Sequence, residues 1–93
     1  MDTNDLSDQA YELIWQAAKI DDTLKSILGS TCSECENEDE YLKTVMEIIE
    51  EIEEETNDYL EEWGLEEMFT VGQYRKHLKK LKLQVKEVID AQR

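Results

Sequence analysis

Apolar residues recur every three or four positions along three segments of the chain, which is the spacing that places them on one face of an α-helix. The first segment covers about residues 5–28, where Asn4 or Asp5 can cap its start. Gly29 follows it, at a position where a helix end favours glycine, and residues 29–37 form the expected connection with a Cys-x-x-Cys motif. The apolar positions of this segment are Leu6, Ala10, Leu13, Ile14, Ala17, Ile20, Leu24, Ile27 and Leu28.

The second segment covers about residues 38–63. Asn37 and Glu40 have the spacing of a capping box at its start, and Gly64 followed by Leu65 is typical of a Schellman ending. Its apolar positions are Tyr41, Leu42, Val45, Met46, Ile48, Ile49, Ile52, Tyr59, Leu60 and Trp63.

The third segment covers about residues 71–91 and follows a loop at 64–70. Thr70 and Gln73 form a second capping box, and Phe69 can pack on Tyr74 as a hydrophobic staple. Connections of this length join neighbouring antiparallel helices. The chain is therefore expected to form one all-α domain over residues 1–93, an antiparallel three-helix bundle (up-down-up) that could also dimerise.

Acidic residues are concentrated in the middle of the chain. Residues 36–67 contain fifteen Asp and Glu and a single basic residue, Lys43, whereas residues 68–93 contain seven basic residues and two acidic ones. The middle block alone therefore carries a charge of −14, equal to the net charge of the whole protein. On the expected second helix, seven carboxylates lie opposite the apolar face and are called the acidic ridge here: Glu40, Glu47, Glu50, Glu51, Glu54, Asp58 and Glu61.

The acidic ridge has two explanations. A surface helix needs a solvated face, and glutamate is a good helix former. Solvated faces usually mix signs, however, because like charges at i and i+4 repel, and Glu47–Glu51 and Glu50–Glu54 are such pairs. Carboxylates repeating about every 5.4 Å along a helix resemble the spacing of phosphates in a nucleic-acid strand, about 7 Å or less. This favours a surface that binds a basic protein.

The charge and the apolar runs of the chain bear on its partners and its compartment. A pI near 4.3 disfavours direct binding to nucleic acid or to an anionic membrane. No apolar run approaches the ~20 residues that cross a bilayer, and the acidic N-terminus does not resemble a secretory signal. We therefore expect a cytoplasmic protein, in the host cytoplasm if a phage encodes it. The function expected is inhibition of a basic, nucleic-acid-binding protein by mimicry of DNA or RNA, by analogy with phage antidefence proteins.

Tyr11 and Trp15 form a second stripe on the first helix, away from its apolar face. Neighbouring helices could cover them. Alternatively, they could anchor a partner or a second copy, because Trp and Tyr dominate binding hot spots.

Cys32 and Cys35 are the only two cysteines. Their spacing suits half a zinc site, a disulfide or two inert thiols, and a full zinc site would need further ligands, for example from a second chain. No metal or cofactor is favoured, and no catalytic motif is present, so we do not expect an enzyme. The alternative function is a homodimeric structural or regulatory module, with a zinc ion or disulfide shared through this motif.

Overall fold

The computed structural model describes residues 3–92, and within that range it is all-α, with five α-helices, one short 3-10 helix and no strand. The three continuous helices expected from the sequence are not all found, because the first two are each broken in two. The elements are η1 (Thr3–Asp5), α1 (Asp8–Ile20), α2 (Asp22–Glu34), α3 (Glu38–Glu54), α4 (Thr56–Glu62) and α5 (Val71–Ala91).

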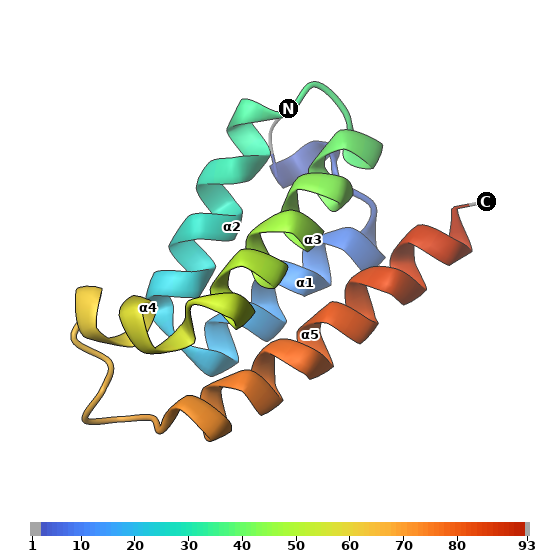
Figure 1. Ribbon diagram of the computed structural model, residues 1–93. Coiled ribbons are helices and arrows are strands. Elements are labelled where there is room, and N and C mark those ends of the chain that lie inside the picture. The colour runs from blue at the N-terminus through green and yellow to red at the C-terminus, as the bar shows by residue number, and fades with distance from the viewer. Residues whose placement is uncertain (1–2, 93) are drawn as a thin grey trace.

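The first break lies at Asp21, in the middle of the helix expected over residues 5–28. Asp21 has an extended backbone (φ −164°, ψ 157°), and its carboxylate accepts a hydrogen bond from the backbone N–H of Leu24 at 2.9 Å. This N-cap starts α2 in a new direction, so that α1 and α2 pack against each other as a helical hairpin (Figure 1). The helix starts later than expected as well, because Ser7 caps α1 by accepting from the N–H of Ala10.

Asp21 also links distant parts of the chain inside the protein. The hydroxyl of Tyr74, on α5, donates to the Asp21 carboxylate at 2.5 Å. The ring centroids of Tyr74 and of Tyr59, on α4, are 5.4 Å apart. Burial raises the pKa of Tyr59 to about 12. Burial, together with the hydrogen bond to Asp21, raises the pKa of Tyr74 far above its ordinary value. The start of α2 is thereby fixed against α4 and α5.

The connection expected over residues 29–37 is much shorter in the structure. Helix α2 continues through Gly29 to Glu34, which leaves only residues 35–37 between α2 and α3. Asn37 caps α3 as expected, accepting from the N–H of Glu40 at 2.8 Å. The Glu40 carboxylate accepts from the backbone N–H of Glu36 instead of that of Asn37.

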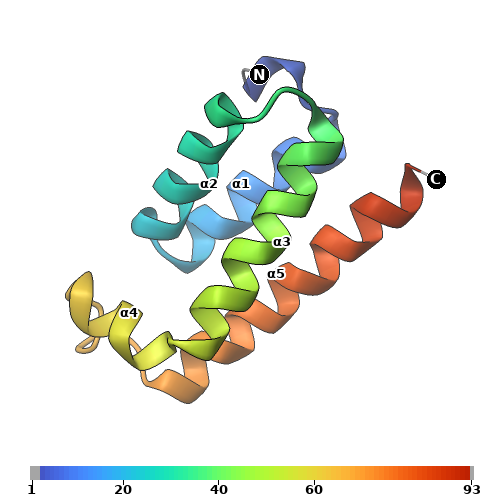
Figure 2. The same cartoon turned by 45° about the horizontal axis from the view of Figure 1, so that its top comes forward.

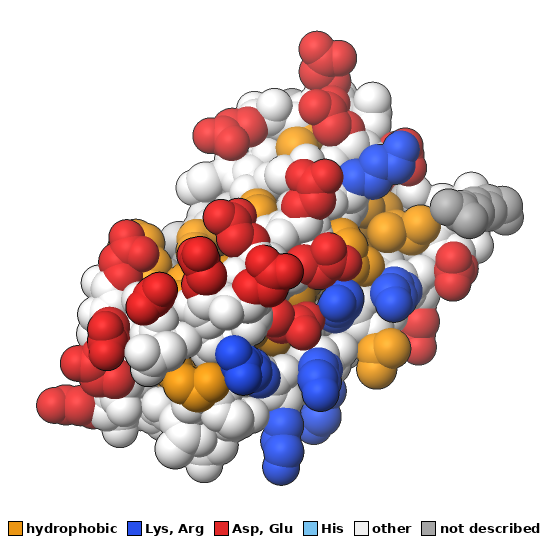
Figure 3. Space-filling view, viewed as in Figure 1, with side chains coloured by type: hydrophobic (Ala, Val, Ile, Leu, Met, Phe, Trp, Pro, Cys, Tyr) orange, Lys and Arg blue, Asp and Glu red, His pale blue; other side chains and the backbone are white. Residues whose placement is uncertain are grey.

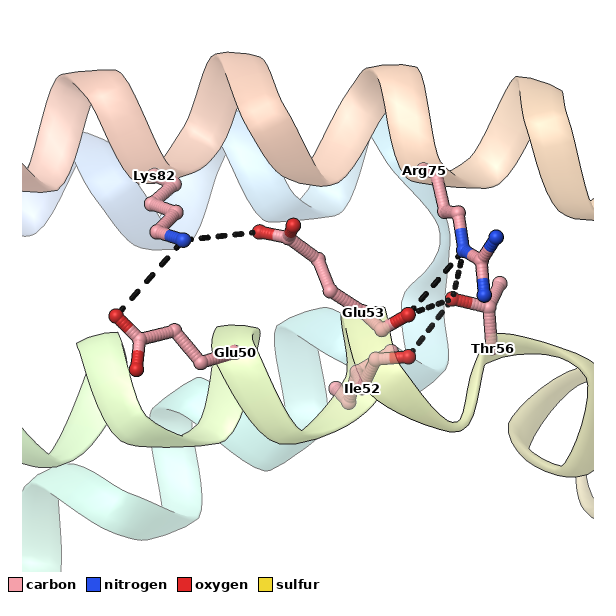
Figure 4. A network of polar contacts seen from close by, with 6 residues as sticks. All are labelled: Glu50, Ile52, Glu53, Thr56, Arg75 and Lys82. Atoms are coloured by element: carbon pink, nitrogen blue, oxygen red, sulfur yellow. Dashed lines mark hydrogen bonds and ion pairs between the residues drawn. The ribbon is translucent and has the colours of Figure 1, made fainter.

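The second break separates α3 from α4 at Glu55. Thr56 is fully buried, and its hydroxyl lies 2.8 Å from the carbonyl oxygen of Ile52 and 3.0 Å from that of Glu53. Arg75, on α5, donates from Nε to the Glu53 carbonyl at 3.2 Å and to the Thr56 hydroxyl at 3.3 Å (Figure 4). A polar side chain and an arginine therefore stabilise the point where the helix changes direction.

Helix α4 ends in the Schellman motif that the sequence predicts. Gly64 has a φ of +67°, and the N–H of Leu65 donates to the carbonyl of Leu60 at 2.8 Å. Trp63, in contrast, was expected on the apolar face of the second helix and is half exposed instead. Since α4 leaves the line of α3, the position of Trp63 no longer faces the core.

Helix α5 covers the range expected for the third helix, and its capping box forms between Thr70 and Gln73. Phe69 packs edge-on against Tyr74, with ring centroids 5.3 Å apart. Successive long helices run in opposite directions, and α5 lies against α1, α3 and α4 (Figures 1 and 2). The fully buried side chains at the centre include Leu13, Leu24, Leu28, Tyr41, Leu42, Val45, Ile49, Tyr74, Leu78, Leu81 and Val85.

Candidate interaction surfaces

All seven carboxylates of the acidic ridge are exposed. Five of them lie on α3, and the remaining two, Asp58 and Glu61, lie on α4 beyond the break. Acidic side chains gather over α3 and α4, and basic side chains lie along α5 beside them (Figure 3). The ridge is therefore present at the surface, but it bends at Glu55 instead of following one straight helix.

Few cations neutralise this surface. Lys82 Nζ lies between α3 and α5, 3.8 Å from Glu50 Oε1 and 3.5 Å from Glu53 Oε1 (Figure 4). Lys43 Nζ lies 3.2 Å from Asp39, one turn earlier on the same helix. Of the ridge carboxylates, only Glu50 has a cationic nitrogen within 4 Å in residues 3–92.

The other basic residues of α5 leave most of the ridge uncompensated. Five are exposed: Arg75, Lys76, Lys79, Lys80 and Lys86. Arg75 donates from Nε to the Glu53 carbonyl and the Thr56 hydroxyl at the break between α3 and α4. None of the five forms an ion pair in the described part of the chain. Salt screens the attraction between these exposed basic residues and the more distant ridge carboxylates. The charge of the ridge therefore remains available to an incoming cation.

Tyr11 and Trp15 remain at the surface. Trp15 is 56% exposed and Tyr11 38%, and their rings meet edge to face with centroids 6.2 Å apart. Neighbouring helices therefore do not cover Trp15, and the two rings form a small exposed aromatic pair on α1.

A groove along α2 was not foreseen from the sequence. It has a volume of about 510 Å³, and Trp63 forms one wall, with half of its surface exposed. The residues of α2 that line it are Asp22, Thr23, Ser26, Ile27, Ser30, Thr31 and Glu34. The groove could not be predicted because it depends on both helix breaks, which bring the end of α4 beside α2.

The two cysteines lie in the core rather than in an open loop. Cys32 belongs to the last turn of α2 and is 1% exposed, and Cys35 caps that helix and is 5% exposed. They do not form a disulfide. Tyr41 is buried near them, its hydroxyl donates to the Leu28 carbonyl at 3.1 Å, and burial raises its pKa strongly.

This placement bears on the metal site considered from the sequence. Within residues 3–92, no three His, Cys, Asp or Glu side chains are grouped so that they could hold a metal ion. A zinc ion shared with a second copy would need both sulfurs at the surface, and a disulfide shared with a second copy would need at least one. The burial of Cys32 and Cys35 therefore disfavours that shared site.

None of the helices described over residues 3–92 combines the length and the apolar character needed to cross a bilayer. Neither protein-family models nor curated proteins nor solved structures give a significant match to this chain.

Proposed function

We propose that this protein is a non-catalytic binding protein that occupies the nucleic-acid-binding surface of a basic protein. The acidic ridge on α3 and α4 would take the place of phosphate groups. The observation that supports this most directly is that six of the seven ridge carboxylates have no cationic nitrogen within 4 Å in the described chain.

The physical argument concerns like charges held close together. Repulsion between carboxylates one turn apart destabilises a helix by a few tenths of a kcal/mol per pair. The repulsion is relieved when a partner supplies positive charge along the same line. Electrostatic attraction of this kind speeds association and weakens steeply as salt increases.

Displacement of a labelled nucleic acid tests this function. The protein is immobilised at low salt, basic proteins from its native cell are captured, and the captured protein is bound to a fluorescent DNA or RNA duplex. Wild-type protein should displace the duplex, with an affinity that falls as salt rises. A partner whose duplex stays bound at saturating protein would contradict the proposal.

Two variants with the same net charge test whether partner binding depends on the acidic ridge or only on the total charge of the protein. The ridge variant carries Glu47→Gln, Glu51→Gln, Glu54→Gln and Asp58→Asn; the control carries Glu12→Gln, Glu66→Gln, Glu87→Gln and Asp90→Asn, all at exposed positions. Exposed ion pairs contribute about 0.2 to 1 kcal/mol each, so the ridge variant should bind the partner about fivefold more weakly or worse. Equal weakening in both variants would show that only the total charge matters.

The exposed pair Tyr11–Trp15 supports a second candidate, a homodimeric structural or regulatory module. Large exposed aromatic side chains are typical anchors of an interface. Light scattering at increasing protein concentration tests it. A dimer that Trp15→Glu dissociates, with helicity unchanged, would favour this function, and a monomer at all concentrations would exclude it.

A further inference from the structure

The groove between α2 and Trp63 is lined by two carboxylates and contains no residue of the acidic ridge. Asp22 and Glu34 belong to its lining near the two ends of α2. They are roughly 18 Å apart along the helix axis, at about 1.5 Å per residue. No lysine or arginine lines the groove.

Trp63 supplies an aromatic wall. It is 50% exposed, whereas its neighbours on α4, Tyr59 and Leu60, are buried. The face of an indole ring attracts a cation, and the planar guanidinium of arginine both stacks on it and donates to carboxylates. Four hydroxyl side chains lie along the groove as further hydrogen-bonding groups: Thr23, Ser26, Ser30 and Thr31.

We infer that this groove binds a short, extended, arginine-containing segment of the basic partner, with one guanidinium against Trp63 and flanking cations near Asp22 and Glu34. An extended chain advances about 3.3 Å per residue, so five to six residues cover the distance between the two carboxylates. The inference rests on the proposed function only in taking a basic protein as the partner. It adds a site that selects arginine by shape as well as by charge.

Binding of a hexapeptide, acetyl-(Arg-Ser)3-amide, tests the groove. The protein contains two tryptophans, so Trp15→Phe leaves Trp63 as the only indole reporter. Titration should change the fluorescence of Trp63 saturably, and the peptide with citrulline in place of arginine, which keeps the shape and lacks the charge, should not. Absence of a saturable change with the arginine peptide would overturn the inference.

Calorimetry on further variants locates the peptide. Trp63→Ala should weaken its binding about threefold to tenfold, and Trp63→Tyr should restore part of the affinity. Glu34→Gln should weaken it about twofold to fivefold, whereas Glu87→Gln, an equal loss of charge outside the groove, should leave it unchanged. Unchanged affinity in Trp63→Ala, or equal losses in Glu34→Gln and Glu87→Gln, would show diffuse attraction instead of a site.

The ridge variant distinguishes failure of this inference from failure of the proposed function. It should bind the hexapeptide with nearly wild-type affinity. If it loses the hexapeptide while Trp63→Ala keeps it, the groove is not the site and the ridge remains a candidate. If the ridge variant still displaces the duplex as well as wild type does, the proposed function fails, and the result at Trp63 is unaffected.

Discussion

Replacing Asp21 with alanine removes two interactions at the point where α1 turns into α2. The Asp21 carboxylate accepts from the Leu24 N–H at 2.9 Å, which caps α2, and from the Tyr74 hydroxyl at 2.5 Å. Both hydrogen bonds are buried, and Asp21 itself is a buried residue. After the substitution, the hydroxyl of Tyr74, a fully buried residue, loses this partner.

The magnitude follows from these two losses. Loss of an N-cap side chain costs about 0.5 to 2 kcal/mol, and a buried hydroxyl left without a partner costs about 1 to 3 kcal/mol. Asp21→Ala should therefore lower the free energy of unfolding by roughly 2 to 4 kcal/mol. A domain of this length has roughly 5 to 14 kcal/mol in total, so the variant should fold but with a much lower urea midpoint.

Urea unfolding followed by far-UV circular dichroism measures this loss, with two control variants. Asp22→Ala changes the exposed neighbour in the first turn of α2 and should cost about 0.5 kcal/mol or less. Asp21→Asn keeps an oxygen that can accept either bond and should cost about 1 kcal/mol. Similar losses in Asp21→Ala and Asp22→Ala would refute the role assigned to the buried carboxylate.

The remaining predictions concern stability. Thr56→Val keeps the shape of the side chain but removes the hydroxyl at the second break, so it should lower the free energy of unfolding by about 1 to 2 kcal/mol; an unchanged urea midpoint would contradict this. Gly64→Ala should lower the free energy of unfolding by about 1 kcal/mol because φ is +67° at Gly64. Gly29→Ala, in the interior of α2 with open space around a new Cβ, should raise it by about 0.5 to 1 kcal/mol; urea unfolding of both variants checks the two signs. Stability should fall as pH rises above about 10, because the unfolded chain then releases phenolic protons that the folded state retains; a pH-independent melting temperature from pH 9 to 11 would contradict the raised pKa values of Tyr41, Tyr59 and Tyr74.

The sequence predicts helices reliably where local signals and apolar spacing agree. The range of α5, its capping box at Thr70 and the Schellman ending at Gly64 follow from such signals. The break at Asp21 was missed because the apolar spacing continues across it, from Ala17 and Ile20 to Leu24. A hairpin also packs these residues into the core or against it, so periodicity cannot distinguish it from one long helix. The sequence Asp21-Asp22-Thr23 was the available signal, since it places good capping residues inside the segment.

The cysteines and the second break were missed for related reasons. Cys32 follows Leu24 and Leu28 at four-residue steps, and this spacing could have placed it on the buried face of α2. Thr56 stands between Ile52 and Tyr59 on the apolar face, and its hydroxyl accepts a hydrogen bond from Arg75, which comes from another helix. Tertiary contacts of this kind cannot be read from local sequence.

The exposure of the acidic ridge could be predicted, because carboxylates opposite an apolar face must meet water unless another helix covers them. The bend of the ridge and the groove beside Trp63 could not. Both require the orientation of α4, which depends on tertiary contacts such as those between Thr56 and Arg75 and between Tyr59 and Tyr74.

Carbodiimide labelling of carboxylates, read by mass spectrometry with and without the captured partner, tests the role of the acidic ridge most directly. Labelling of Glu47, Glu51 and Glu54 should fall in the complex, whereas labelling of Glu12 and Glu87, on the α1 and α5 side, should remain unchanged. Equal labelling of the ridge with and without partner, in a complex that is demonstrably formed, would contradict the proposal that these carboxylates meet the basic surface.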